Sequence, residues 1–205
     1  MNPNRISLTR TISAVALSLG LTSGALADVP PNITPEERAL LPRWCAYVQG
    51  GGGAQHPEVY KAMINRYGDG WTHMHHYCYA LVDNMRLDRY SVRNNPSYAN
   101  WSRAIANIDY VLRSTDTARD FPFRQEALAR KARLQMRFSD PAAALATAGQ
   151  LMAEWPTIPD GYIMVADILL RAGKREQALA ILAKGEAAVE DKKGFALQRG
   201  MLKLN

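Results

Sequence analysis

Histidine and cysteine side chains cluster in the short stretch GWTHMHHYCYAL, residues 70–81. Three of the chain's four histidines, His73, His75 and His76, and one of its two cysteines, Cys78, fall within six residues. Imidazole nitrogen and thiolate sulfur are ligands that zinc and other transition metals favour, so the stretch could hold a metal ion. The same residues could instead supply one end of a disulfide, or form a helix whose apolar side faces the core.

Helical periodicity predicts that these side chains point in different directions. The apolar stripe of a helix over residues 71–86 would consist of Met74, Tyr77, Cys78, Leu81 and Met85. His73 and His76 would lie on one flank of that stripe and His75 on the other. One helix therefore cannot present all three histidines and Cys78 to a single ion.

A metal site would need further ligands, and the nearest candidates are His56 and Cys45. The signatures H-E-x-x-H, C-x-x-C and C-x-x-C-H are absent from the sequence, which argues against the common zinc-protease, thioredoxin-like and haem-attachment sites. We therefore predict no cofactor, and we keep a zinc, copper or haem site at His73, His75 and His76 as the alternative.

The two cysteines predict a disulfide. Cys45 and Cys78 both lie beyond the N-terminal 27 residues, and two cysteines in an oxidising compartment most often pair. Such a bridge would tie the N-terminal part of the chain to a later helix, adding about 3 kcal/mol of stability. A catalytic pair of Cys78 with His75 or His76 is disfavoured because adjacent helical side chains point apart. We expect no enzymatic activity.

The N-terminus has the pattern of a secretory signal peptide. Two arginines precede an apolar run over residues 12–21, and Ala25 and Ala27 then form an A-x-A cleavage site. We predict that residues 1–27 are removed by cleavage after Ala27, which places the mature protein in the periplasm or outside the cell. No later apolar run reaches the about 20 residues of a spanning helix, so we expect no membrane span after cleavage.

The charge of the chain is mildly basic. The formal net charge is +6, and it falls to about +4 when the two arginines of the signal peptide leave. The remaining basic residues are spread along the chain without a block of five or more, so we predict no nucleic-acid partner.

A pattern with a period of 34 residues marks the C-terminal part of the chain. One series is Leu128, Ala132, Ala144, Leu145, Ala148 and Pro156, and adding 34 to each number gives Tyr162, Ala166, Ala178, Leu179, Leu182 and Glu190. Five of the six pairs keep a small or apolar residue. Self-similarity at this period is typical of stacked helical hairpins.

Local signals within the repeat predict where its helices begin and end. In the second copy, the apolar stripe of the first helix consists of Tyr162, Val165, Ala166 and Leu169. Gly173 is placed to end that helix in a left-handed conformation. In the first copy, residues 139–141 (Ser-Asp-Pro) are suited to the N-cap and first turn of the second helix.

These residues resemble the tetratricopeptide repeat. The first six places of the family pattern are filled by Tyr162, Ala166, Gly173, Ala178, Leu182 and Gly185, whereas Glu190 departs from it at the last. The resemblance covers two units over residues 122–190 and implies an all-α, right-handed superhelix of antiparallel helical hairpins. Residues 28–121 would form an irregular N-terminal helical region with a degenerate repeat, whose helices cover residues 71–85 and 97–114. Residues 191–205 would form a C-terminal capping helix.

The resemblance also implies a function. Tetratricopeptide proteins bind protein partners on the concave surface formed by the first helix of each unit. By position, that surface here and its border would contain Glu126, Arg130, Arg133, Arg137, Asp160, Asp167 and Arg171. We therefore expect a non-enzymatic adaptor of the cell envelope that binds another protein. The alternative is an envelope protein that handles metal or haem through residues 73–78.

Overall fold

The computed structural model describes residues 33–49, 55–90, 98–138 and 140–203. The predicted signal peptide, residues 1–27, and Ser139 lie outside the described residues.

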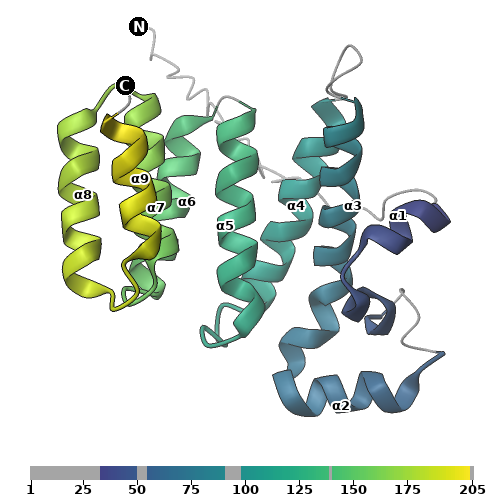
Figure 1. Ribbon diagram of the computed structural model, residues 1–205. Helices are drawn as coiled ribbons and strands as arrows, with labels where there is room; N and C mark the ends of the chain where they lie inside the picture. Colours follow the sequence, from purple (N-terminus) through teal and green to yellow (C-terminus); the bar gives the residue numbers. More distant parts are fainter. Residues whose placement is uncertain (1–32, 50–54, 91–97, 139, 204–205) are drawn as a thin grey trace, which may run out of the picture.

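Helices form all the regular structure of the described residues, which confirms the predicted all-α class (Figure 1). The elements are α1 (Pro35–Leu40), η1 (Arg43–Tyr47), α2 (Pro57–Tyr67), η2 (Asp69–His73), α3 (Met74–Tyr90), α4 (Tyr98–Ser114), α5 (Pro122–Arg137), α6 (Pro141–Glu154), α7 (Pro159–Arg171), α8 (Arg175–Ala188) and α9 (Lys193–Lys203). η1 and η2 are short 3₁₀ helices. No described helix is long and apolar enough to cross a lipid bilayer.

The longer helices pack as adjacent pairs. α3 packs on α4, α5 on α6 and α7 on α8, and each pair packs on the next through α4 with α5 and α6 with α7. α9 lies against α7 and α8, as Figure 1 shows at the C-terminal end of the row. The predicted helices of both repeat copies and of the upstream pair are therefore present. The handedness and superhelical form stay predictions of the resemblance.

The N-terminal part of the described chain contains the short helices α1, η1 and η2, whose boundaries have local causes. α1 begins at a capping box in which the Thr34 hydroxyl accepts from the Glu37 N–H and the Glu37 carboxylate accepts from the Thr34 N–H. α1 ends at Leu40, its extended C-cap residue Leu41 directly precedes Pro42, and the chain continues as η1. Further on, α3 begins at Met74 instead of Trp71, because residues 69–73 form the tighter η2.

Both predicted helix caps are present. Gly173 adopts a φ of +73°, its N–H donates to the Leu170 carbonyl, and the Lys174 N–H donates to the Leu169 carbonyl. This is the Schellman arrangement, which satisfies the last carbonyls of α7. At the start of α6, the Asp140 carboxylate accepts from the Ala143 N–H and Pro141 occupies the first turn.

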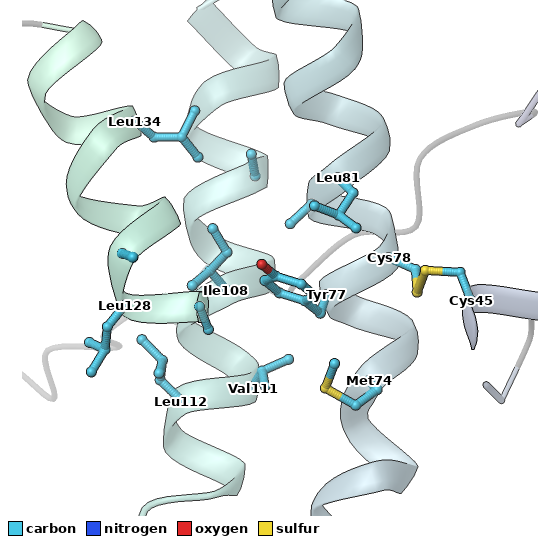
Figure 2. Close-up of a cluster of buried hydrophobic side chains, with 14 of the residues drawn as sticks. Cys45, Met74, Tyr77, Cys78, Leu81, Ile108, Val111, Leu112, Leu128 and Leu134 are labelled. Carbon is cyan, nitrogen blue, oxygen red and sulfur yellow. A yellow bond between two sulfur atoms is a disulfide. The ribbon is translucent and has the colours of Figure 1, made fainter. Parts of the chain in front are cut away.

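Two apolar clusters form the core. The first joins η1, α3, α4 and α5, and Figure 2 shows its side chains meeting between these helices. Its members include the predicted stripe residues Met74, Tyr77 and Leu81. The second cluster joins α5 to α9 through small residues, among them Ala166 and Ala178, which are both fully buried. Buried alanines let paired helices approach closely, as the repeat pattern predicts.

Candidate functional site

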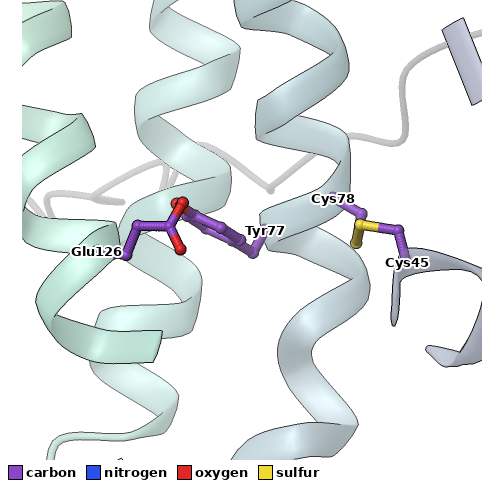
Figure 3. The surroundings of a disulfide bond; sticks show 4 residues. All are labelled: Cys45, Tyr77, Cys78 and Glu126. Carbon is purple, nitrogen blue, oxygen red and sulfur yellow. A yellow bond between two sulfur atoms is a disulfide. The ribbon is translucent and has the colours of Figure 1, made fainter. Parts of the chain in front are cut away.

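The disulfide between Cys45 and Cys78 is present and confirms the predicted pairing. The two Cα atoms are 5.9 Å apart, and the bridge joins η1 to α3 across 33 residues of sequence. Figure 3 shows that Cys78 leaves α3 toward η1, whereas its neighbour Tyr77 points from α3 toward Glu126 on α5. Consecutive residues of α3 thus fasten the helix to the N-terminal segment on one side and to the next hairpin on the other.

The three clustered histidines lie where η2 meets α3. The ring centroids of His75 and His76 are only 4.3 Å apart, and His76 packs at 3.9 Å on Tyr110 of α4. The prediction that His75 and His76 lie on opposite flanks of the helix is therefore wrong for their rings. The cause is local, because the His75 Nδ1–H donates back to the Thr72 carbonyl at 2.9 Å. His73 packs on the edge of the same Tyr110 ring.

Burial keeps two of these histidines neutral. Desolvation, together with the neighbouring His76, lowers the pKa of His75 from 6.5 to about 4. Burial likewise lowers the pKa of His76, whose Nδ1–H donates to the Asn107 side-chain oxygen at 2.8 Å. In both rings the hydrogen bond at Nδ1 leaves Nε2 as an acceptor with a free lone pair.

The disulfide removes Cys78 from the set of possible metal ligands, because a bridged sulfur offers no thiolate. His56 stays exposed at the start of α2 and packs on Tyr47. Within the described ranges, no three His, Cys, Asp or Glu side chains are grouped to hold a metal ion. Because Cys78 is bridged, a metal site at His73, His75 and His76 would have only imidazole nitrogens as ligands from this stretch.

Four of the predicted partner-binding residues meet in one groove between the first helices of the two repeat units. The groove has a volume of about 300 Å³ and is lined by Ala132, Arg133, Met136, Arg137, Met164, Asp167, Ile168 and Arg171. Arg171 pairs with Asp167 at 3.0 Å along α7, and Arg137 pairs with Asp88 of α3. Arg133 is exposed and has no ion-pair partner among the residues that the structure describes.

Glu126 and Arg130 are engaged inside the molecule. The Tyr77 hydroxyl donates to Glu126 at 2.8 Å and accepts from the Arg130 Nε–H at 3.0 Å, so both residues tie α5 to α3. Burial raises the pKa of the Tyr77 phenol, which keeps it protonated as a donor. Arg130 also lines a smaller hollow of about 140 Å³ between α3 and α5, next to Arg133 and Arg137.

Asp160 lies apart from the groove. It occupies the first turn of α7, is exposed, and is two turns of helix away from Asp167. An acidic residue at a helix N-terminus interacts favourably with the helix dipole, which accounts for Asp160 without a partner.

Arg124, which the sequence pattern does not single out, makes several buried polar contacts. Its guanidinium donates to Glu154 at 2.7 and 3.1 Å, to the Leu112 carbonyl at 2.6 Å and to Asp116 at 3.2 Å. The side chain is almost fully buried and joins the end of α4 to α5 and α6. In the sequence, Arg124 is only an arginine beside the first apolar turn of α5. Many exposed residues occupy such a position, so the sequence alone does not indicate that Arg124 is buried.

Comparison with known proteins identifies no relative: no family model, no curated protein and no solved structure matches the chain.

Proposed function

We propose that this protein is an exported, non-enzymatic scaffold of the tetratricopeptide type that binds another protein along the first helices of its hairpins. The observation that carries this proposal is the groove between α5 and α7, where Arg133, Arg137, Asp167 and Arg171 surround apolar side chains. A groove with an apolar base and a charged border is suited to a peptide segment, because the base supplies contact area and the charges supply orientation.

Export is supported by two independent features. The sequence has the signal-peptide pattern over residues 1–27, and the structure contains the Cys45–Cys78 disulfide, which persists in oxidising compartments. N-terminal sequencing of the exported protein tests this part of the proposal, and the expected first residue is Asp28. A first residue of Met1 in protein from the envelope or medium would contradict it.

Charge reversal in the groove tests the binding part. Arg133→Glu reverses an exposed charge within the groove, and Lys184→Glu reverses an exposed charge on α8, a second helix. Each variant is purified from the producing cells after mild crosslinking, and the co-purified proteins are identified by mass spectrometry. We expect a partner that is retained by wild type and Lys184→Glu and lost with Arg133→Glu. A partner retained equally by both variants would show that the groove is not its binding site.

The metal-handling alternative keeps one favourable observation, the neighbouring Nε2 lone pairs of His75 and His76. Metal-binding histidines typically donate a hydrogen bond from the ring nitrogen that does not bind the metal. Metal analysis of protein purified without an affinity tag tests this function. Stoichiometric zinc or copper that is lost in a His75→Gln/His76→Gln variant would favour it over the scaffold.

A further inference from the structure

An apolar pocket of about 250 Å³ opens beside the disulfide, where α1 and η1 meet α3. Its lining includes Leu41, Pro42, Ala46 and Val48, together with the bridged Cys45 and Cys78. Val48 and both cysteines are buried at the base of this region, whereas Ala46 is exposed. The disulfide holds η1 against α3 and so fixes the distance between the two sides of the pocket.

Three side chains with polar groups, Arg38, Arg43 and Tyr79, line this apolar surface. Tyr79 is only 7% exposed and lines the pocket, and its ring packs edge-on against the rings of His75 and His76. Arg38 and Arg43 also line the pocket, and both are exposed. Neither guanidinium has a carboxylate within ion-pair distance among the described residues.

The size and chemistry of the pocket define a class of ligand. An apolar cavity of about 150 Å³ is enough to bind benzene, and drug-sized ligands occupy roughly 300 Å³ or more. A pocket of about 250 Å³ therefore fits a molecule with an apolar body of about eight carbons. Arginine favours carboxylates, because its planar donors match the two oxygens.

We propose that this pocket binds a small amphipathic carboxylate, with its apolar body beside the disulfide and its carboxylate at Arg38 and Arg43. Tyr79 would donate a hydrogen bond to the bound molecule. The site lies on η1, α1 and α3, outside the groove between α5 and α7, so it does not depend on the proposed scaffold function. Binding at this pocket and loss of a protein partner at the groove are separately measurable.

Calorimetric titration of the purified, disulfide-bonded protein with octanoate tests the proposal. We expect one molecule to bind per chain, and octanol, which lacks the charge, to bind at least tenfold more weakly. Ala46→Trp fills the pocket from an exposed position, and Arg38→Gln/Arg43→Gln removes the cations, so each change should weaken octanoate binding tenfold or more. Lys61→Gln, an exposed cation on α2, is the matched control and should bind as wild type does.

The same chemistry occurs in a short fatty acid and in the C-terminal residue of a peptide. Titration with an acetylated tripeptide that ends in leucine distinguishes the two sources, since the tighter of the two ligands identifies the source. Absence of binding by both ligands at millimolar concentration would overturn the proposal. Equal binding to Ala46→Trp and Lys61→Gln would also overturn it, provided that circular dichroism and intact mass show both variants folded and bridged.

Discussion

Arg124 is a charged side chain buried between three helices, so its hydrogen-bond partners must offset the free energy that its desolvation costs. It donates to Glu154, to Asp116 and to the Leu112 carbonyl. Breaking a buried pair by removing one partner costs about 3–5 kcal/mol, because the other charge stays buried without compensation. We expect Arg124→Met to lower the free energy of unfolding by that amount in urea titrations.

A neighbouring arginine provides the control for this change. Arg119 also lies within 3.7 Å of Glu154, but its side chain is 64% exposed. Exposed pairs contribute about 0–1 kcal/mol, so Arg119→Met should be close to neutral. Equal losses for Arg119→Met and Arg124→Met would mean that burial does not set the strength of this network.

His75 makes stability depend on pH in a defined window. Its pKa falls to about 4 in the folded protein, below the 6.5 of an exposed histidine. Between these values the unfolded chain binds the proton and the folded chain does not, so the free energy of unfolding falls as the pH drops from 6.5 to about 4. We expect His75→Gln to flatten this part of the pH dependence, and NMR to show His75 titrating near pH 4.

The pH range over which stability falls distinguishes the contribution of His75 from that of the carboxylates. The guanidinium of Arg86 lowers the pKa of Glu37 to about 2, so its contribution is lost only below pH 4.5. A His75→Gln variant with an unchanged slope between pH 6.5 and 4 would show that the ring is solvated in the native protein. His56→Gln, which alters an exposed histidine, serves as the control.

At the scale of elements, Gly161 fixes how closely α7 approaches α6. A Cβ at Gly161 would lie 2.5 Å from the Cα of Met152, a backbone atom that cannot move aside alone. We expect Gly161→Ala to separate the two helices and to destabilise the protein by about 1–3 kcal/mol, the usual cost of overpacking. Thermal unfolding of the purified variant measures this loss.

Gly149, inside α6, is the matched control because nothing lies within 4 Å of a Cβ placed there. Gly149→Ala should stabilise the protein by about 0.5–1 kcal/mol, since alanine loses less backbone freedom than glycine in a helix. If Gly161→Ala were also stabilising, the contact between α6 and α7 would be looser than the structure places it.

The disulfide stabilises the junction of η1 with α3. Cross-links that close loops of this length add about 3 kcal/mol, so a Cys45→Ala/Cys78→Ala variant should lose about that much unfolding free energy. Intact mass after alkylation without reductant first establishes that the cysteines are paired in the wild type. A wild type in which both cysteines take the label would contradict the bridge.

Sequence reasoning predicted the helical elements well where periodicity and caps agree. The 34-residue repeat predicts α5 to α8, and Gly173 and Asp140 mark their ends by conformational preferences that act locally. The apolar periodicity predicts that α3 begins at Trp71, three residues before its actual start at Met74. A 3₁₀ turn and an α-helix share their first apolar positions, so the periodicity does not distinguish η2 from the start of α3.

The candidate site was predicted less completely, because polar contacts between side chains of different hairpins follow no fixed spacing in the sequence. Helix position alone placed Glu126 and Arg130 with the groove residues, but the Tyr77 hydroxyl draws both toward α3. Arg124 is missed for the same reason, because its partners lie 8 to 30 residues away and have no fixed spacing. The disulfide was predictable because only two cysteines were available to pair.

At the scale of the whole molecule, the two apolar clusters share α5. Leu128 and Leu134 of α5 belong to the first cluster, Ala132 belongs to the second, and Met164 packs against both. Shared residues couple the stability of neighbouring repeats. We therefore expect the described parts of the chain to unfold in one cooperative transition.

The tryptophans make this expectation measurable. All four belong to the first cluster or pack against it, so their fluorescence reports that cluster, whereas far-ultraviolet circular dichroism reports every helix. The two urea transitions should coincide. A fluorescence midpoint separate from the dichroism midpoint would show that the clusters unfold independently.

The polar contacts between hairpins restrict how this chain can change its length during evolution. Repeat proteins grow and shrink by duplication or loss of whole hairpins, which requires interchangeable junctions. Insertion of a hairpin between α4 and α5 would separate Tyr77 from Glu126 and Arg124 from the Leu112 carbonyl, and would leave buried polar groups unpaired. The junction of α6 with α7 is formed by Gly161 and small apolar residues, which a duplicated hairpin would reproduce. Homologues that differ in repeat number should therefore differ after α6 and keep the segment from η1 to α6 intact.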